Sequence, residues 1–543
     1  MKPLVCRIFF RVCTHLYENV CVYAHCPTHP TRHMNMRTLQ SFPAQQQREL
    51  VTTPMRTLWL ICLLLWVSTA ATSIASHPSS ESGAWTRLHL FQTARDTGDR
   101  LAQKADVQLS LDASTPSTGG NVAVLHPETS YQRIQGFGGA FTEAAAINFF
   151  SMPVTQQQSI LEAYFGKTGN RYSLCRVHMN SCDFCVSSYS EDDIENDYAL
   201  LGFNIRRDKE HLVPFIQAAM NYSSLPINIF LSPWSPPAWM KSNGAMDGSN
   251  QPGLKNSTLV HASWALFYSK FIDAYKKEGI NLWGLTVQNE PLFAAPWEAC
   301  YYSAEDELNF LKSFLGPEIR YSHPDVKIYI FDHNKDEVYD FANTILSDPV
   351  ARNYVDGTAF HWYAGDHFPN LDRLHQAHPD KLLLATEGCE GPGVILDDWS
   401  RGEHYGRDIM GDLQSYTTGW VDWNMVLDMQ GGPNHLHNYC DAPVIVDQKK
   451  GDIHLQIPYY YMGHFSRFLP PGSIHLRMDT SQLSGVELVA FQLPSGDLSI
   501  VALNLGDSTV TFTLVVPVAG KPYSAPITVP SHSIITLTSS DGW

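Results

Sequence analysis

The sequence has few charged residues and no excess of positive charge. Lys, Arg, Asp and Glu together make up 17% of the 543 residues, and the formal net charge at pH 7 is -17. Such an acidic chain is poorly suited to the phosphate backbone of nucleic acids, so we expect no nucleic-acid partner. The hydrophobic fraction of 44% and the aromatic fraction of 12% indicate instead a folded protein with a large core.

The motifs of several common enzyme classes are also missing. No HExxH, Walker A or GxSxG sequence occurs, which removes support for a metalloprotease, an NTPase or a serine esterase. The run 136–141 lacks the third glycine of a dinucleotide fingerprint, and the run that begins at Asp332 lacks the glycine of a calcium loop. We therefore expect neither a cofactor nor a metal ion.

Cysteine is scarce over most of the chain. Five of the 11 Cys residues precede residue 76, and the six that remain are too few for a disulfide-dense scaffold. Cys182 and Cys185 have the spacing of a CxxC motif, but no second pair accompanies them. The spacing therefore predicts neither a zinc site nor a redox function.

Residues 1–75 are expected to be a leader. Met55 begins a short charged stretch, which is followed by an apolar run over residues 58–67 and by small residues up to Ala75. This order is typical of a signal peptide, and the apolar run is shorter than the roughly 20 residues of a membrane-spanning helix. Two alternatives stay open: translation begins at Met55, or residues 58–67 act as a signal anchor. Both predict a secreted or lysosomal protein, membrane-associated in the second case.

The spacing of apolar residues changes twice along the rest of the chain. Strand-like alternation marks residues 76–133 and 471–543, whereas residues 134–470 alternate short apolar runs with longer amphipathic stretches. The candidate barrel strands are 134–138, 173–179, 227–232, 282–288, 327–332, 357–361, 381–387 and 419–424. We predict an α/β protein in which residues 134–470 form a (β/α)8 TIM barrel, and in which the N-terminal and C-terminal segments form a flanking β-sandwich.

Two glutamates follow predicted barrel strands. Glu290 comes just after the fourth strand and Glu387 ends the seventh. Active sites of such barrels lie at the carboxyl ends of the strands, and glycoside hydrolysis needs a pair of carboxylates. Either glutamate alone is more typical of a cap or an ion pair, but the two together predict a glycosidase. Burial and mutual repulsion are expected to raise the pKa of Glu290.

Aromatic residues gather near the ends of the same strands. They occur in the segments 232–239, 296–298, 361–363 and 422–424. Flat rings beside polar groups suit a pyranose, which has apolar faces and an equatorial belt of hydroxyls. His361, within the third segment, is expected to have either a structural role or a supporting role behind the residues that contact the sugar.

These motifs, together with residues 136–143, 176–184 and 431–443, resemble the glucosylceramidases of glycoside hydrolase family 30 in the same order along the chain. The resemblance implies a retaining mechanism with Glu290 as acid/base and Glu387 as nucleophile, supported by Arg176. It also implies a β-glucosidase that needs no cofactor. The residues expected to bind the substrate are Asp183, Trp234, Asn289, Trp297, Tyr363, Trp423 and Asn438.

The resemblance further implies a glycolipid substrate: glucosylceramide would be cleaved to glucose and ceramide at a membrane surface, with a saposin-like activator. Trp297, Tyr439 and Cys440 differ from their counterparts in the mammalian enzymes, which leaves the preferred aglycone open. One alternative is a secreted β-1,6-glucanase or β-xylosidase of the same family. An alternative of another class is an inactive carbohydrate-binding protein.

Overall fold

A computed structural model describes residues 84–111 and 121–542. The leader expected at residues 1–75, with its signal peptide or signal anchor, lies outside this range. Within the range, no helix combines the length and the apolar character needed to cross a membrane.

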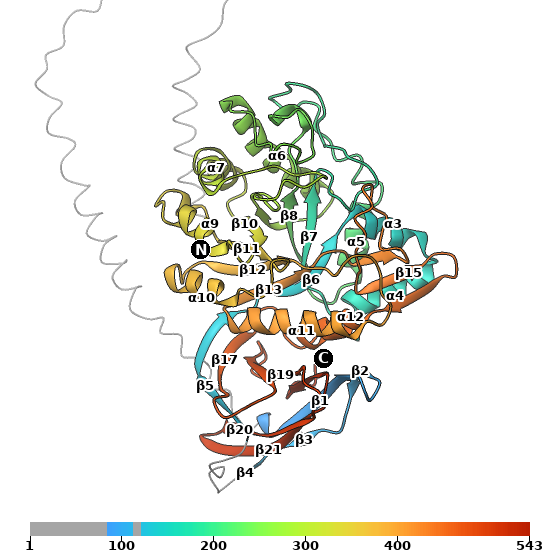
Figure 1. Ribbon diagram of the computed structural model, residues 1–543, viewed down its shortest axis with the longest axis vertical. Coiled ribbons are helices and arrows are strands. Elements are labelled where there is room, and N and C mark those ends of the chain that lie inside the picture. The colour runs from blue at the N-terminus through green and yellow to red at the C-terminus, as the bar shows by residue number, and fades with distance from the viewer. Residues whose placement is uncertain (1–83, 112–120, 543) are drawn as a thin grey trace, which may run out of the picture. The chain divides into compact units, whose positions relative to one another are not determined.

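In the described part of the chain, eight parallel strands close into a barrel (Figure 1). The pairing of β13 with β6 completes the ring. The strands are β6 (Gly136–Phe141), β7 (Leu174–Met179), β8 (Asn228–Pro233), β9 (Leu282–Thr286), β10 (Lys327–Asn334), β11 (Gly357–His361), β12 (Leu382–Glu387) and β13 (Thr417–Asp422). Each predicted barrel strand overlaps one of them, so the predicted TIM barrel is confirmed.

Helices cover the outside of the barrel, and every residue of β6, β7, β11 and β13 is buried. Such continuous burial is expected of parallel strands that are covered on both faces. The helices are α3 (Glu143–Ser151), α4 (Val154–Phe165), α5 (Leu212–Tyr222), α6 (Thr258–Lys277), α7 (Ala304–Phe310), α8 (Gly316–Ser322), α9 (Val338–Leu346), α10 (Phe368–Ala377), α11 (Trp399–Gln414) and α12 (Ile457–Ser466). Short helical turns are η1 (Ala84–Thr86), η2 (Ala238–Met240), η3 (Leu311–Leu315) and η4 (Ala351–Asn353).

The flanking sheet is built from both ends of the described chain, as predicted for the β-sandwich. Strand β1 (Arg87–Ala94) pairs with β22 (Ser533–Thr538), and β5 (Val122–Arg133) pairs with β17 (Ile474–Asp479). Its other strands are β2 (Asp99–Gln103), β3 (Val107–Gln108), β4 (Ser110–Leu111), β18 (Glu487–Gln492), β19 (Leu498–Asn504), β20 (Val510–Val518) and β21 (Lys521–Val529). A separate small sheet contains β14 (Val426–Asp428), β15 (Val444–Asp447) and β16 (Asp452–Leu455).

The two faces of strand β18 belong to different cores. Leu488 and Ala490 lie in the core of the sandwich, whereas Val489 and Phe491 pack with the barrel core, which includes residues of α11 and α12. Successive strand residues point to opposite faces, so one strand can serve both cores. The sheet is therefore attached to the barrel by a buried apolar face. Helices α11 and α12 lie between the sheet and the barrel strands (Figure 1).

Strands β6 and β7 approach each other too closely at Gly138 for any side chain. A Cβ atom at Gly138 would lie 1.7 Å from the backbone oxygen of Leu174, whereas a Cβ atom at Gly284 in β9 would meet no atom closer than 3.4 Å. We expect Gly138→Ala to destabilise the fold by more than about 4 kcal/mol, or to prevent folding, because the clash involves backbone. Gly284→Ala is the matched control in the same barrel. Its melting temperature, measured by thermal denaturation followed by circular dichroism, should be close to that of the wild type. Equal melting temperatures for the two variants would contradict this packing argument.

Candidate active site

A cavity of about 500 Å³ opens beyond the carboxyl ends of the barrel strands and contains both predicted catalytic glutamates. Arg176 and Asn289 lie buried beside it and hydrogen-bond to each other over 2.9 Å. The predicted site residues that line the cavity are Asp183, Trp234, Glu290, Trp297, Tyr363, Glu387, Trp423 and Asn438. The structure thus brings the whole predicted set together, although its members come from strands and loops far apart in the sequence.

The two glutamates face each other across this cavity. One carboxylate oxygen of Glu290 and one of Glu387 lie within 4.8 Å of each other. Glu387 is the last residue of β12, and Glu290 follows β9 in a left-handed backbone conformation, with φ of 45°. That conformation costs a glutamate about 1 to 3 kcal/mol, and the surrounding structure has to hold it in place. The Glu290 amide does so in part by donating to the Asp332 carbonyl over 2.9 Å.

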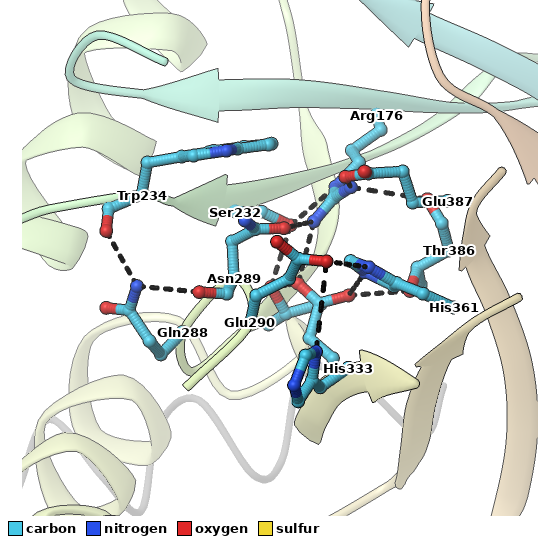
Figure 2. A network of polar contacts seen from close by, with 12 residues as sticks. Arg176, Ser232, Trp234, Gln288, Asn289, Glu290, His333, His361, Thr386 and Glu387 are labelled. Atoms are coloured by element: carbon cyan, nitrogen blue, oxygen red, sulfur yellow. Dashed lines mark hydrogen bonds and ion pairs between the residues drawn. The ribbon is translucent and has the colours of Figure 1, made fainter. Parts of the chain in front are cut away.

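Arg176, on β7, is fully buried and is the centre of a polar network beneath the cavity (Figure 2). Its Nη1 donates to Glu387 Oε2. Its Nη2 donates to Asp332 Oδ2 over 2.8 Å and to Asn289 Oδ1 over 2.9 Å, and its Nε donates to Ser232 Oγ over 2.9 Å. A planar guanidinium with its donors engaged in this way fixes the position of the Glu387 carboxylate.

Asp332 is a central member of this network that sequence reasoning missed. It occupies an irregularity in β10, with φ of 59°. Besides Arg176, it accepts hydrogen bonds from Thr286 and Thr386 over 2.6 Å each and from His361 over 3.0 Å. Burial raises the pKa of this carboxyl, but Arg176 and His361 outweigh burial and hold it well below its usual range. Its position at the end of a predicted barrel strand was the signal that could have found it.

His361 links the network to Glu290. Its Nε2 lies 3.0 Å from Asp332 Oδ1 and its Nδ1 lies 3.4 Å from Glu290 Oε1. Both neighbours are carboxylates, so both ring nitrogens are placed to donate. Burial lowers the pKa of His361, but the charge of Glu387 and the hydrogen bonds to Asp332 and Glu290 raise it to about 9. His361 is therefore a charged partner of Glu290, next to the residues expected to act on the sugar.

The expected rise in the pKa of Glu290 is wrong. Burial does raise it, but the neighbouring imidazoles of His333 and His361 outweigh burial and lower the pKa to about 2. His333 is the second imidazole, with Nδ1 3.8 Å from Glu290 Oε1. Burial has the larger effect on Glu387, whose pKa is raised although His361 and Arg176 act to lower it. The expected rise rested on burial and on the second carboxylate, whereas the two imidazoles come close to Glu290 only in the folded chain.

Aromatic rings form one wall of the cavity. The rings of Trp234 and Trp423 are stacked, with centroids 4.8 Å apart and an interplanar angle of 20°. The Arg176 guanidinium lies 4.7 Å from the Trp234 centroid, so the cation also holds this ring. Trp297 meets Phe293 edge-on at 5.9 Å. Such a wall offers apolar surface to one face of a sugar ring.

Polar groups complete the cavity. Asn438 Nδ2 donates to Asp183 Oδ2 over 3.0 Å, and the Tyr363 hydroxyl donates to Glu387 Oε1 over 2.9 Å. Gln288, another residue that the sequence did not single out, donates to the backbone oxygen of Trp234 over 2.7 Å and so supports the aromatic wall from behind. Paired carboxylates, an aromatic wall and directional polar groups are together the requirements of a monosaccharide site.

The fold and this site define the chain as a glycoside hydrolase. Residues 134–469 match the glycosyl hydrolase family 30 TIM-barrel domain, and residues 472–537 match the glycosyl hydrolase family 30 beta sandwich domain. The chain belongs to glycosyl hydrolase family 30.

Named relatives include glucosylceramidases and glucanases. The chain is 34% identical to the lysosomal acid glucosylceramidase of Mus musculus, over 79% of this chain and 85% of that protein. It is 37% identical to putative glucosylceramidase 3 of Caenorhabditis elegans, over 81% and 83%, and 29% identical to the endo-1,6-beta-D-glucanase neg1 of Aspergillus fumigatus, over 75% and 84%. Among solved structures, SrfJ from Salmonella typhimurium superposes with a TM-score of 0.78 at 31% identity, covering 83% of this chain and 99% of that one.

The lowered pKa of Glu290 makes a prediction about stability. Its folded value of about 2 lies below the ordinary 4.5, so the ionised side chain stabilises the fold above about pH 4.5, and this stabilisation is lost as the pH falls toward 2. Glu290→Gln has no such charge. The free energy of unfolding is measured by urea denaturation at a series of pH values. Between about pH 5 and pH 2, this free energy should fall by up to about 3 kcal/mol more for the wild type than for the variant. Parallel pH profiles would show that the imidazoles do not act on Glu290 in this way.

Proposed function

We propose that this protein is a retaining β-glucosidase that hydrolyses glucosylceramide to glucose and ceramide. The observation that carries the proposal is the placement of the Glu290 and Glu387 carboxylate oxygens within 4.8 Å of each other. Retaining enzymes hold their carboxyl groups about 5 to 5.5 Å apart, whereas inverting enzymes need about 6.5 to 9.5 Å to admit a water molecule between carboxylate and sugar. The close pair favours direct attack by a carboxylate on the sugar.

In the first step, Glu387 attacks the anomeric carbon while Glu290 gives a proton to the departing glycosidic oxygen. Arg176 and the Tyr363 hydroxyl each hold one oxygen of Glu387, which aims the carboxylate at the sugar. His361 carries a proton 3.4 Å from Glu290 and supplies it through this hydrogen bond, since Glu290 itself has a low pKa in the free enzyme. The products of this step are a glucosyl–Glu387 ester and the free alcohol of the aglycone.

In the second step, Glu290 acts as the base. It takes a proton from a water molecule, which attacks the anomeric carbon and releases Glu387. Two inversions give glucose with the β configuration of the substrate. Asn289, held by Arg176, is the donor to the sugar 2-hydroxyl, a contact that strengthens as positive charge develops on the ring.

The roles of the two glutamates are separated by matched amide variants. Glu387→Gln should abolish turnover and covalent trapping by a 2-fluoro glucoside, because no nucleophile remains. Glu290→Gln should hydrolyse a glucoside with a poor leaving group about 10²- to 10⁴-fold more slowly than the wild type. It should still hydrolyse a glucoside with an activated phenol leaving group, because that leaving group departs without a proton. The measurements are steady-state rates and peptide mapping of the trapped enzyme. An adduct on any carboxylate other than Glu387 would refute the assignment.

Exposed apolar side chains on the loops beyond the strands support a lipid aglycone. They come from the loops that follow β9, β11, β12 and β14, and each is at least 40% exposed: Phe293, Tyr363, Ile395, Leu396, Met429 and Leu436. Apolar side chains gathered on exposed loops are typical of surfaces that meet a lipid or another protein. The proposal therefore includes work at a membrane surface in a lysosomal or secretory compartment, with a saposin-like activator as a candidate partner.

The apolar loops can be tested apart from the chemistry. The double change Ile395→Ser and Leu396→Ser should lower hydrolysis of glucosylceramide in vesicles by about tenfold, because two apolar side chains no longer bury in the lipid. Hydrolysis of a soluble aryl glucoside should not change, since neither residue lines the cavity. Tyr321→Ser is the control: Tyr321 is 88% exposed but lies on α8, just before β10, at the opposite ends of the strands. Equal losses with the soluble and the vesicle substrate would contradict the proposed lipid contact.

A soluble β-1,6-linked glucan is the second candidate substrate, favoured by the 29% identity to a fungal endo-1,6-beta-D-glucanase. Rates with this glucan and with glucosylceramide vesicles, with and without a saposin, decide between the two. A preference for the glucan would replace the ceramide assignment while leaving the retaining mechanism intact.

A further inference from the structure

Three soft donor atoms converge beside the sugar cavity without a role in the proposed reaction. The sulfur atoms of Cys182 and Cys185 are 3.6 Å apart, and His178 Nε2 lies 3.9 Å from the Cys185 sulfur. All three side chains are buried, and the three donor atoms lie within 4.8 Å of one another. The CxxC spacing alone predicted no redox function. The imidazole comes from β7, which the spacing could not reveal.

The backbone already has the geometry of a small disulfide ring. The Cys185 amide donates to the Cys182 carbonyl over 3.1 Å, which closes a four-residue turn. Turns of this kind bring their first and last Cα atoms within about 7 Å, and disulfides form at Cα separations of about 4.4 to 6.8 Å. The two sulfur atoms still have to close from 3.6 Å to a bond length of about 2.05 Å, so bond formation combines side-chain rotation with a small adjustment of the turn.

His178 is oriented to activate the neighbouring thiol. Its Nδ1 donates to the Asn180 carbonyl over 2.7 Å, which turns Nε2 toward Cys185. Burial lowers the pKa of His178, but Cys185 raises it to about 10; burial raises the pKa of Cys185, but Cys182 and His178 lower it to about 7. Cys300, equally buried but without an imidazole, has its pKa raised to about 12 by burial. Among these buried thiols, Cys185 is the one held as a thiolate near neutral pH.

The turn and the residue that follows it contribute to two different cavities. Asp183, inside the turn, lines the sugar cavity and accepts from Asn438 over 3.0 Å. Val186, just after the turn, lines a separate cavity of about 460 Å³. The two thiols are buried and line neither cavity, so a small oxidant reaches them through local opening of the turn, and any change in the turn acts directly on Asp183.

We propose that Cys182 and Cys185 form an oxidation site that takes a peroxide and closes to a disulfide, which shifts Asp183 and weakens sugar binding. The Cys185 thiolate attacks one oxygen of the peroxide and becomes a sulfenic acid, and hydroxide leaves. The Cys182 thiol then attacks the sulfenic sulfur, so that the disulfide forms and water is released. The peroxide gains the two electrons that the thiols lose, and a small-molecule dithiol restores the reduced pair.

The chemical test uses the full chain treated with hydrogen peroxide, quenched with N-ethylmaleimide and mapped by mass spectrometry. After peroxide treatment, the peptide that contains residues 182–185 should no longer carry N-ethylmaleimide, and its mass should be two hydrogens below that of the reduced peptide. The peptide that contains Cys300 should stay fully alkylated. His178→Asn should slow the reaction by about five- to tenfold, because the thiolate fraction falls while each thiolate becomes more nucleophilic. Equal oxidation at Cys300, no oxidation at Cys182 and Cys185, or a bound thiophilic cation that blocks both thiols would overturn the proposal.

The effect of oxidation on sugar binding is tested through KM, and this second test rests on the proposed glucosidase activity. Oxidation should raise KM for an aryl glucoside by about three- to tenfold, the loss expected from one displaced hydrogen bond, and dithiothreitol should reverse it. Cys185→Ser, or Cys182→Ala if that variant does not fold, should abolish both the disulfide and the change in KM. A disulfide without any change in KM would overturn the link to Asp183. Failure to hydrolyse any glucoside would refute the proposed activity, while the mass spectrum would still decide the oxidation site.

Discussion

Arg176 is a buried cation on which the rest of the site depends. A charge without solvent is costly unless other groups compensate it, and Arg176 is compensated by Glu387 and Asp332. The same guanidinium holds the amide of Asn289 and lies against Trp234. The residue that satisfies a folding requirement therefore also sets the position of the nucleophile, of a sugar donor and of the aromatic wall. Removal of Arg176 would leave these two buried carboxylates with only the charge of His361 close to them.

The charges around Arg176 also explain the proton balance of the site. Arg176 and His361 supply two positive charges against the carboxylates of Asp332, Glu290 and Glu387. Burial, together with the one negative charge that remains in excess, raises the pKa of Glu387, while the neighbouring histidines lower that of Glu290. In the proposed cycle, the catalytic proton moves between His361 and Glu290 through their hydrogen bond. The two residues therefore titrate together, and the pKa that controls catalysis belongs to the pair rather than to one residue.

The barrel and the glutamate pair could be predicted from sequence because both depend on local pattern. Short apolar runs mark strands, and a carboxylate directly after such a run lies at the rim of a barrel. Asp332 also ends a predicted barrel strand, but its role comes from an irregularity in β10 and from partners on four other strands, which the local pattern does not show. The direction of the pKa shift of Glu290 was wrongly predicted for the same reason, because His333 and His361 are near Glu290 in space but not in sequence.

The sheet that joins both ends of the described chain has a consequence for how the protein is made. Strand β1 pairs with β22, and β5 lies beside β17 and β20. During synthesis, β1 and β5 leave the ribosome long before their partner strands are made. Their apolar faces therefore stay unpaired until the entire barrel has been synthesised. The sandwich is therefore the last unit to close during folding. Any truncation of the final strands would leave the earliest ones without a partner and exposed to aggregation or to chaperones.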